Sequence, residues 1–168
     1  MEEKSFTLIE ILVYVGVLGI LFTAILSFLI WTIRSNNKIT VLRETLDNSR
    51  RTLEIIAYEI RSAKGVYTPT TSASQLSLEV AQSLPAGEET SYIDFFLCGT
   101  QICLKREGQN PIVLTLNNLQ VDSLVFTQVV TNELPSLQVD LSVSYKNPTN
   151  RPDYQASVDL SSTISLRS

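Results

Sequence analysis

Few residues in this chain have types and spacing that could do chemistry. Glu10 is the first, because it is the one charge in the 28-residue apolar run from Phe6 to Ile33. A carboxylate about one turn into a membrane helix costs about 2.5–3.5 kcal/mol on insertion scales, so such an acid is by default a functional residue. The alternative is an acid at the membrane edge that reaches headgroups or water.

Cys98 and Cys103 are the second candidate, and the chain has no other cysteine. If Thr100 and Gln101 form a two-residue turn, the two cysteines face each other across a hairpin with Cα atoms about 4.5 Å apart. A disulfide tolerates that distance, and the alternative is a pair of free thiols. We predict the disulfide, which would stabilise the fold modestly because the enclosed loop is short.

The sequence lacks the residues that many common enzyme mechanisms need. The chain has no histidine, which excludes Ser-His-Asp and Cys-His nucleophile systems. With two cysteines and no histidine, the usual ligands of a zinc site are missing. The six glycines are scattered and form no phosphate loop. The acids are dispersed, so neither a glycosidase pair nor a calcium cluster is indicated. We expect no enzyme, no cofactor and no metal.

The apolar run at residues 6–33 is the element that positions Glu10. A helix needs about 20 apolar residues to cross the hydrocarbon core of a bilayer, and this run is longer. It has no polar face, which favours a membrane-spanning helix over an amphipathic one. A buried core helix is the alternative, and the length argues against it.

The amphipathic segment that follows, at residues 34–65, continues the helix. Apolar or small residues recur at spacings of three and four, which places them on one helical stripe. They are Ile39, Leu42, Leu46, Ser49, Leu53, Ile56, Ile60 and Ala63. Lys64, Gly65 and then Pro69 are typical of a helix end. The stripe could form a coiled coil with another chain, but packing on the chain's own strands is favoured, because those strands need a cover.

Residues 66–168 alternate in a way that predicts a β-rich domain. Leu137, Val139, Leu141, Val143 and Tyr145 alternate strictly with polar residues. Shorter alternating runs lie at 76–80, 93–97, 112–116, 121–130, 156–160 and 164–166. Strands of this kind form an antiparallel sheet with one buried face. The expected fold class is therefore α+β, with a long N-terminal helix packed on a C-terminal antiparallel β-sheet domain.

The start of the chain resembles a known signal. Ser5-Phe6-Thr7-Leu8-Ile9-Glu10, preceded by the short charged segment Met1-Glu2-Glu3-Lys4, closely resembles the class III signal of type IV pilins and of the pseudopilins of type II secretion. Residues 1–5 are then the expected leader peptide. The resemblance implies cleavage between Ser5 and Phe6 by a prepilin peptidase and N-methylation of Phe6. The family normally has glycine before the cut, where this chain has Ser5, which is also small.

The same resemblance implies a role for Glu10 and a set of partners. In the family, this acid lies near the N-terminal amine of a neighbouring subunit, so Glu10 is expected to pair with Phe6 of another subunit during assembly. The implied partners are other pilin or pseudopilin subunits, prepilin peptidase, the inner-membrane assembly platform and the lipid bilayer. The implied location is the cytoplasmic membrane, with one span and an extracytoplasmic β-domain, before incorporation into a pilus or pseudopilus. An extracytoplasmic domain favours the disulfide.

The basic residues on either side of the apolar run predict the opposite orientation in the membrane. Lys4 precedes the apolar run, whereas Arg34 and Lys38 follow it, and basic residues tend to stay on the cytoplasmic side. We follow the resemblance, which puts the leader inside.

Weaker similarities narrow the family. Residues 46–51, continuing to 60–63, and the closing segment 161–167 resemble the J-type minor pseudopilins of type II secretion and related minor pilins. The expected function is thus a minor pilin or pseudopilin, a structural and assembly subunit of a type II secretion pseudopilus or a type IV pilus.

Two other functions stay open. One is a single-pass membrane protein with an extracytoplasmic ligand-binding or sensor β-domain, which needs neither cleavage nor Glu10. The other is a tip component of a DNA-uptake pilus. From residue 65 onward five basic residues face ten acids, a balance of −5, so no nucleic acid is expected as a partner.

Overall fold

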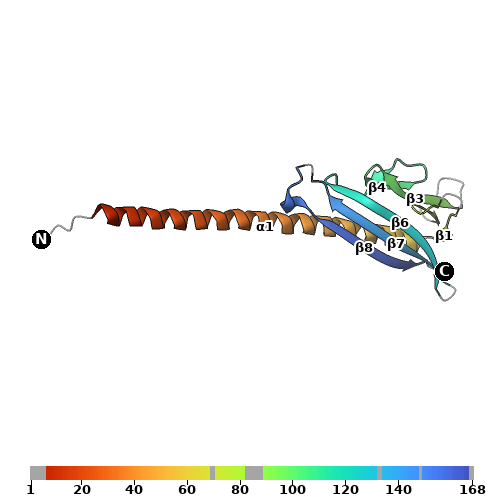
Figure 1. Ribbon diagram of the computed structural model, residues 1–168. Helices are drawn as coiled ribbons and strands as arrows, with labels where there is room; N and C mark the ends of the chain where they lie inside the picture. The colour runs from red at the N-terminus through yellow and green to blue at the C-terminus, as the bar shows by residue number, and fades with distance from the viewer. Residues whose placement is uncertain (1–6, 69–70, 82–88, 132–133, 148, 167–168) are drawn as a thin grey trace.

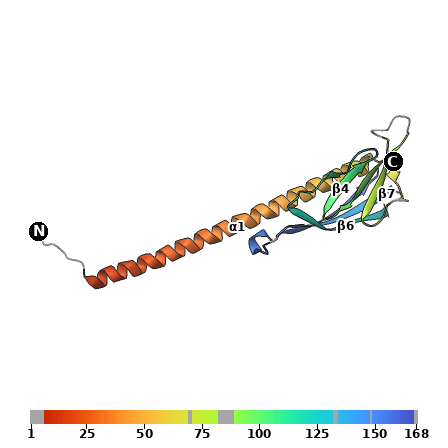
Figure 2. The ribbon, with the colours of Figure 1, turned by 90° about the horizontal axis from the view of Figure 1, so that it is seen from above.

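The computed structural model describes residues 7–68, 71–81, 89–131, 134–147 and 149–166. A single long helix is followed by antiparallel strands, an α+β arrangement as predicted. The globular part packs along one side of the C-terminal half of the helix, and the N-terminal half projects from it alone (Figures 1 and 2). The elements are α1 (Leu8–Ser62), β1 (Gly65–Val66), β2 (Gln75–Val80), β3 (Ser91–Cys98), β4 (Gln101–Arg106), β5 (Ile112–Val113), β6 (Leu119–Thr131), β7 (Leu134–Tyr145), the 3-10 helix η1 (Pro152–Tyr154) and β8 (Ser157–Ser165).

Helix α1 is continuous over 55 residues, which corresponds to about 83 Å. No proline precedes Pro69 in the sequence, so nothing interrupts the ladder of hydrogen bonds. The helix ends at Ser62 because Ala63 is extended and the Lys64 N–H donates to the carbonyl of Glu79 on β2. Gly65, which the sequence analysis included in the amphipathic helix, lies instead in strand β1.

The strands form two sheets, where the sequence analysis expected one. One sheet has the order β1-β2-β3-β4-β5 and the other the order β6-β7-β8. The second sheet is made of long strands, each paired with the next one along the chain, Leu119 with Tyr145 at one end and Ser136 with Ser165 near the other. The strand expected at 112–116 is only Ile112–Val113, and both residues are exposed.

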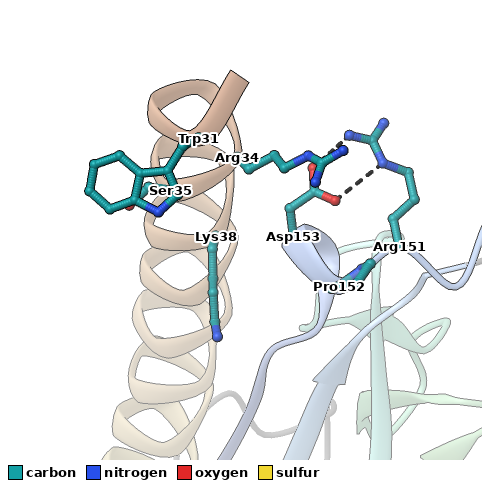
Figure 3. A pocket seen from close by; sticks show the side chains of 7 residues that line it. All are labelled: Trp31, Arg34, Ser35, Lys38, Arg151, Pro152 and Asp153. Carbon is teal, nitrogen blue, oxygen red and sulfur yellow. Dashed lines mark hydrogen bonds and ion pairs between the residues drawn. The ribbon is translucent and has the colours of Figure 1, made fainter. Parts of the chain in front are cut away.

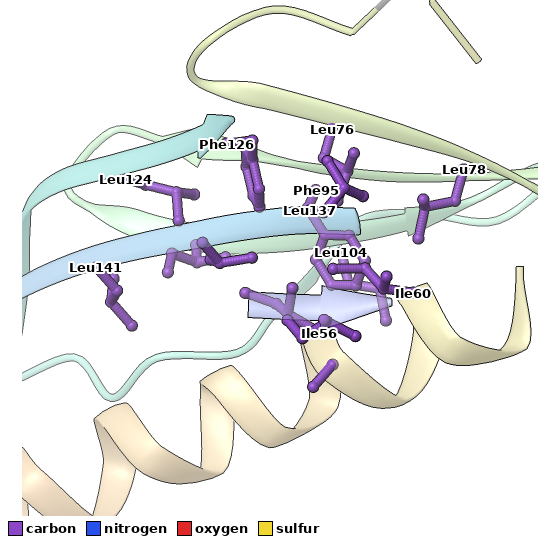
Figure 4. Close-up of a cluster of buried hydrophobic side chains, with 14 of the residues drawn as sticks. Ile56, Ile60, Leu76, Leu78, Phe95, Leu104, Leu124, Phe126, Leu137 and Leu141 are labelled. Carbon is purple, nitrogen blue, oxygen red and sulfur yellow. The ribbon is translucent and has the colours of Figure 1, made fainter. Parts of the chain in front are cut away.

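One apolar core joins α1 to both sheets. The strands β7 and β8 contact α1, while β6 contacts β2 and β4 of the other sheet. Figure 4 shows side chains of α1 and of both sheets meeting between the ribbons. The labelled members of this core are Ile56, Ile60, Leu76, Leu78, Phe95, Leu104, Leu124, Phe126, Leu137 and Leu141.

The buried stripe of α1 differs from the predicted one at its N-terminal end. Ser49, Ile56, Ile60 and Ala63 are buried as predicted. The helix also buries Val41, Thr45 and Thr52, which are not on the predicted stripe, whereas Ile39 and Leu42 of that stripe are 47% and 45% exposed. Thr45 and Ser49 donate their hydroxyl hydrogens to carbonyls one turn back, at 2.8 and 2.7 Å, so they enter the core with their polar atoms satisfied.

Candidate functional site

Glu10 lies in the first turn of α1 and its side chain is exposed. The backbone N–H groups of Glu10 and Ile11 both donate to the carbonyl of Thr7, at 3.1 and 3.3 Å, which fixes the start of the helix. The next charge along the helix is Arg34. The predicted cleavage and methylation residues, Ser5 and Phe6, lie outside the described residues.

The apolar segment around Glu10 has no cover within the described chain. No part of the span that could cross a membrane is buried, and the side chains from Leu8 to Ile33 point outward on every side. Apolar surface of this extent is stable only when lipid or another protein covers it. One long apolar helix near the N-terminus is therefore consistent with a single-pass membrane anchor.

A lone carboxylate in such surroundings needs a partner. In low dielectric, opposite charges attract much more strongly than in water, and an unpaired ion is costly. Where lipid or protein covers this end of the helix, an opposite charge beside Glu10 would therefore stabilise it.

The cysteines are joined by a disulfide, with Cα atoms 5.9 Å apart. The turn between them differs from the expected one by one residue, because Gly99 and Thr100 form it and Cys98 pairs with Gln101. Cys103 pairs with Phe96, so the bond links diagonal neighbours on one face of the hairpin. The missed signal was Gly99, whose φ of 69° suits the first position of a glycine-led hairpin turn.

Two carboxylates of α1 to which no role was assigned from the sequence hold the helix to the globular part. Glu59 is 6% exposed and accepts a hydrogen bond from Arg106 on β4 at 2.6 Å. Glu44 accepts one from Asn118 at 2.7 Å. The signal for Glu59 was its place beside Ile56 and Ile60 on the buried stripe, where a charge requires a partner.

A third carboxylate, Asp153 of η1, lies where the helix enters the globular part. It is 7% exposed and accepts hydrogen bonds from Arg151 at 2.6 and 3.2 Å (Figure 3). It also accepts one from Asn37 of α1 at 3.3 Å. Burial by itself would raise the pKa of Asp153, but the hydrogen bonds from Arg151, Asn37 and the backbone, with the charge of Arg151, lower it from its ordinary value of 3.8. The carboxylate is thereby kept charged and fixed in place.

The geometry offers an uncovered apolar helix and polar contacts between α1 and the globular part. Within the described ranges, no three His, Cys, Asp or Glu side chains gather in a group that could hold a metal ion. The candidate functional residues lie in three places: Glu10 on the uncovered helix, the disulfide in the β3–β4 hairpin, and Asp153 where η1 contacts α1.

Comparison with family models, with curated proteins and with solved structures found no match.

Proposed function

We propose that the chain is a minor pilin or pseudopilin, a structural and assembly subunit of a type II secretion pseudopilus or a type IV pilus. The observation that carries the proposal is the uncovered apolar half of α1 with one carboxylate, Glu10, in its first turn. A simple anchor needs the apolar residues, but it does not require a carboxylate in the first turn of the helix.

The N-terminal signal supports the same function. The motif Phe6-Thr7-Leu8-Ile9-Glu10 leads in the sequence into α1, which begins at Leu8. Prepilin peptidase would cut before Phe6, leaving a new amine that is then methylated. A single helix then serves first as a membrane anchor and afterwards as a filament element.

The proposed assembly step is the pairing of Glu10 with the Phe6 amine of a neighbouring subunit. Apolar helices packed side by side bury their surfaces in any register, because Leu, Ile and Val contacts are interchangeable. One ion pair in low dielectric distinguishes one register from the others, since any other register leaves both charges unpaired. Glu10 would thus set the axial offset between subunits.

The globular part supports this role through its attachment to α1. Apolar packing at Ile56 and Ile60, together with the pairs Glu59–Arg106 and Glu44–Asn118, connects the helix and both sheets as one body. Movement of the apolar half during extraction would carry the globular part with it.

Substitution of Glu10 tests the proposal. The full-length protein carrying Glu10→Gln, which keeps the shape and removes the charge, is expressed with its filament system, and its incorporation is measured in sheared filaments. We expect a large loss of incorporation with unchanged membrane levels. Glu54→Gln, at an exposed acid on the same helix, is the matched control and should incorporate normally. Equal incorporation of both variants would contradict the proposal.

A further inference from the structure

A pocket of about 540 Å³ lies between α1 and η1, at the point where the helix enters the globular part (Figure 3). It combines one face of the helix with a loop more than a hundred residues later in the chain. The lining residues are Trp31, Arg34, Ser35, Lys38, Arg151, Pro152 and Asp153.

The pocket carries excess positive charge. Its single acid, Asp153, is already bonded to Arg151 and Asn37. Among the described residues the salt bridges are Asp153–Arg151 and Glu59–Arg106, so no carboxylate there neutralises Arg34 or Lys38. Both of these side chains are exposed at the pocket.

Arg151 is held in a fixed orientation beside them. Two of its nitrogens bond to Asp153, and its guanidinium lies 4.9 Å from the ring centre of Tyr154. A guanidinium has five N–H donors, so further donors remain for a ligand. Three cations on two elements form a site for an anion with several oxygens, such as a phosphate.

The expected height of the pocket relative to a bilayer indicates which phosphate compound could reach it. The uncharged stretch from Ile11 to Ile33 spans about 34 Å as a helix, close to the hydrocarbon core of about 30 Å. Arg34 therefore falls at the headgroup level, and Trp31 lies one turn before it, where tryptophan is enriched in membrane proteins. The loop with η1 is at the end of the globular part nearest the apolar half of α1 (Figure 1).

We propose that this pocket binds the phosphate of an anionic phospholipid, with Arg34 and Lys38 as the main cationic contacts and Arg151 as a third. The site would hold the globular part against the bilayer at a fixed height. The inference requires only that residues 11–33 span the membrane, and it is independent of filament assembly.

The sole tryptophan makes the site directly observable, because Trp31 lines it. Full-length protein in uncharged detergent is titrated with phosphatidylglycerol, with phosphatidylcholine, and with inorganic phosphate. Trp31 emission reports occupancy, and native mass spectrometry counts the retained lipids. We expect saturable binding of phosphatidylglycerol, at least about tenfold tighter than that of phosphatidylcholine.

Charge-matched variants decide whether the pocket is responsible. Arg34→Gln with Lys38→Gln should weaken phosphatidylglycerol binding by at least about tenfold. Arg50→Gln with Arg61→Gln removes the same charge from exposed positions farther along the helix and should leave binding unchanged. Equal weakening by both pairs, or no saturable binding, would overturn the site. Inorganic phosphate that competes as tightly as the lipid would overturn the lipid as its ligand. Circular dichroism of both pairs checks that the fold is retained.

Discussion

Buried charges at single residues decide how firmly α1 is attached to the globular part. Glu59 is nearly inaccessible, and Arg106 is the partner that compensates its charge. A buried carboxylate that loses its partner carries the full cost of its desolvation. The pair therefore makes the stability of the helix–sheet contact depend on Arg106.

Arg106→Met should lower the free energy of unfolding by about 1–3 kcal/mol, less than for a fully buried pair because the Arg106 side chain is 33% exposed. Lys105→Met, at the exposed neighbour on β4, is the control and should change stability little. Denaturant unfolding of the full-length chain in detergent measures both. Combining Arg106→Met with Glu59→Leu should recover much of the loss, since no charge is then left unpaired. A loss no larger than that of the control would show that the pair is not structural.

The junction at Asp153 predicts a dependence on pH. The pKa of Asp153 is lowered on folding, so its contribution to stability is fully present above the ordinary value of 3.8 and is lost as the pH falls through the lowered value. Asp153→Asn should therefore be less stable than the natural chain at pH 7, and the difference should vanish in strong acid. Thermal unfolding from pH 7 to pH 2 measures this, with Asp159→Asn at an exposed strand position as the control. A difference that stays constant to pH 2 would contradict the assignment.

Among the elements, the β3–β4 hairpin depends on its cross-link. The bond closes a loop between residues separated by five positions, and the chain-entropy model gives such a loop a stabilisation of about 2 kcal/mol. Replacing both Cys98 and Cys103 with serine should lower stability by about that amount and leave the fold intact. A thiol assay on the native protein should find no free thiol. Two free thiols would show that the bond does not form.

Much of the element order could be predicted from patterns. The apolar and amphipathic segments of α1 follow from length and periodicity, and the strict alternation at 137–145 correctly predicts the buried face of β7. The predicted buried stripe of α1 was partly wrong. A count of apolar residues overlooks Thr45 and Thr52, which are small enough to let the sheet pack closely on the helix. Thr52 is buried with its hydroxyl unpaired among the described residues, a burial that periodicity does not predict.

The division into two sheets and the polar contacts of the site could not be predicted. Alternation indicates which residues of a strand face inward, but it does not say which strands pair. Asp153 and Asn37 are 116 positions apart, and their contact depends on where the loop at η1 folds back onto α1. The pocket beside them depends on the same packing of the η1 loop against α1.

As a whole molecule, the protein is a long helix with a globular part at one end (Figure 2). The uncovered half has only two environments that suit it, a bilayer or a bundle of similar helices. A prepilin-type subunit would occupy both in turn, and Glu10 would matter in the second. The order of these states depends on removal of the leader, which creates the amine that Glu10 is proposed to bind.

The most direct test of this account is the intact mass and N-terminal sequence of the protein recovered from membranes, with and without prepilin peptidase. The account predicts a mature chain that begins at methylated Phe6 when the peptidase is present, and an uncut chain when it is absent. A chain that still begins at Met1 in the presence of the peptidase would contradict it, and a single-pass membrane protein with a sensor domain would then be the better description.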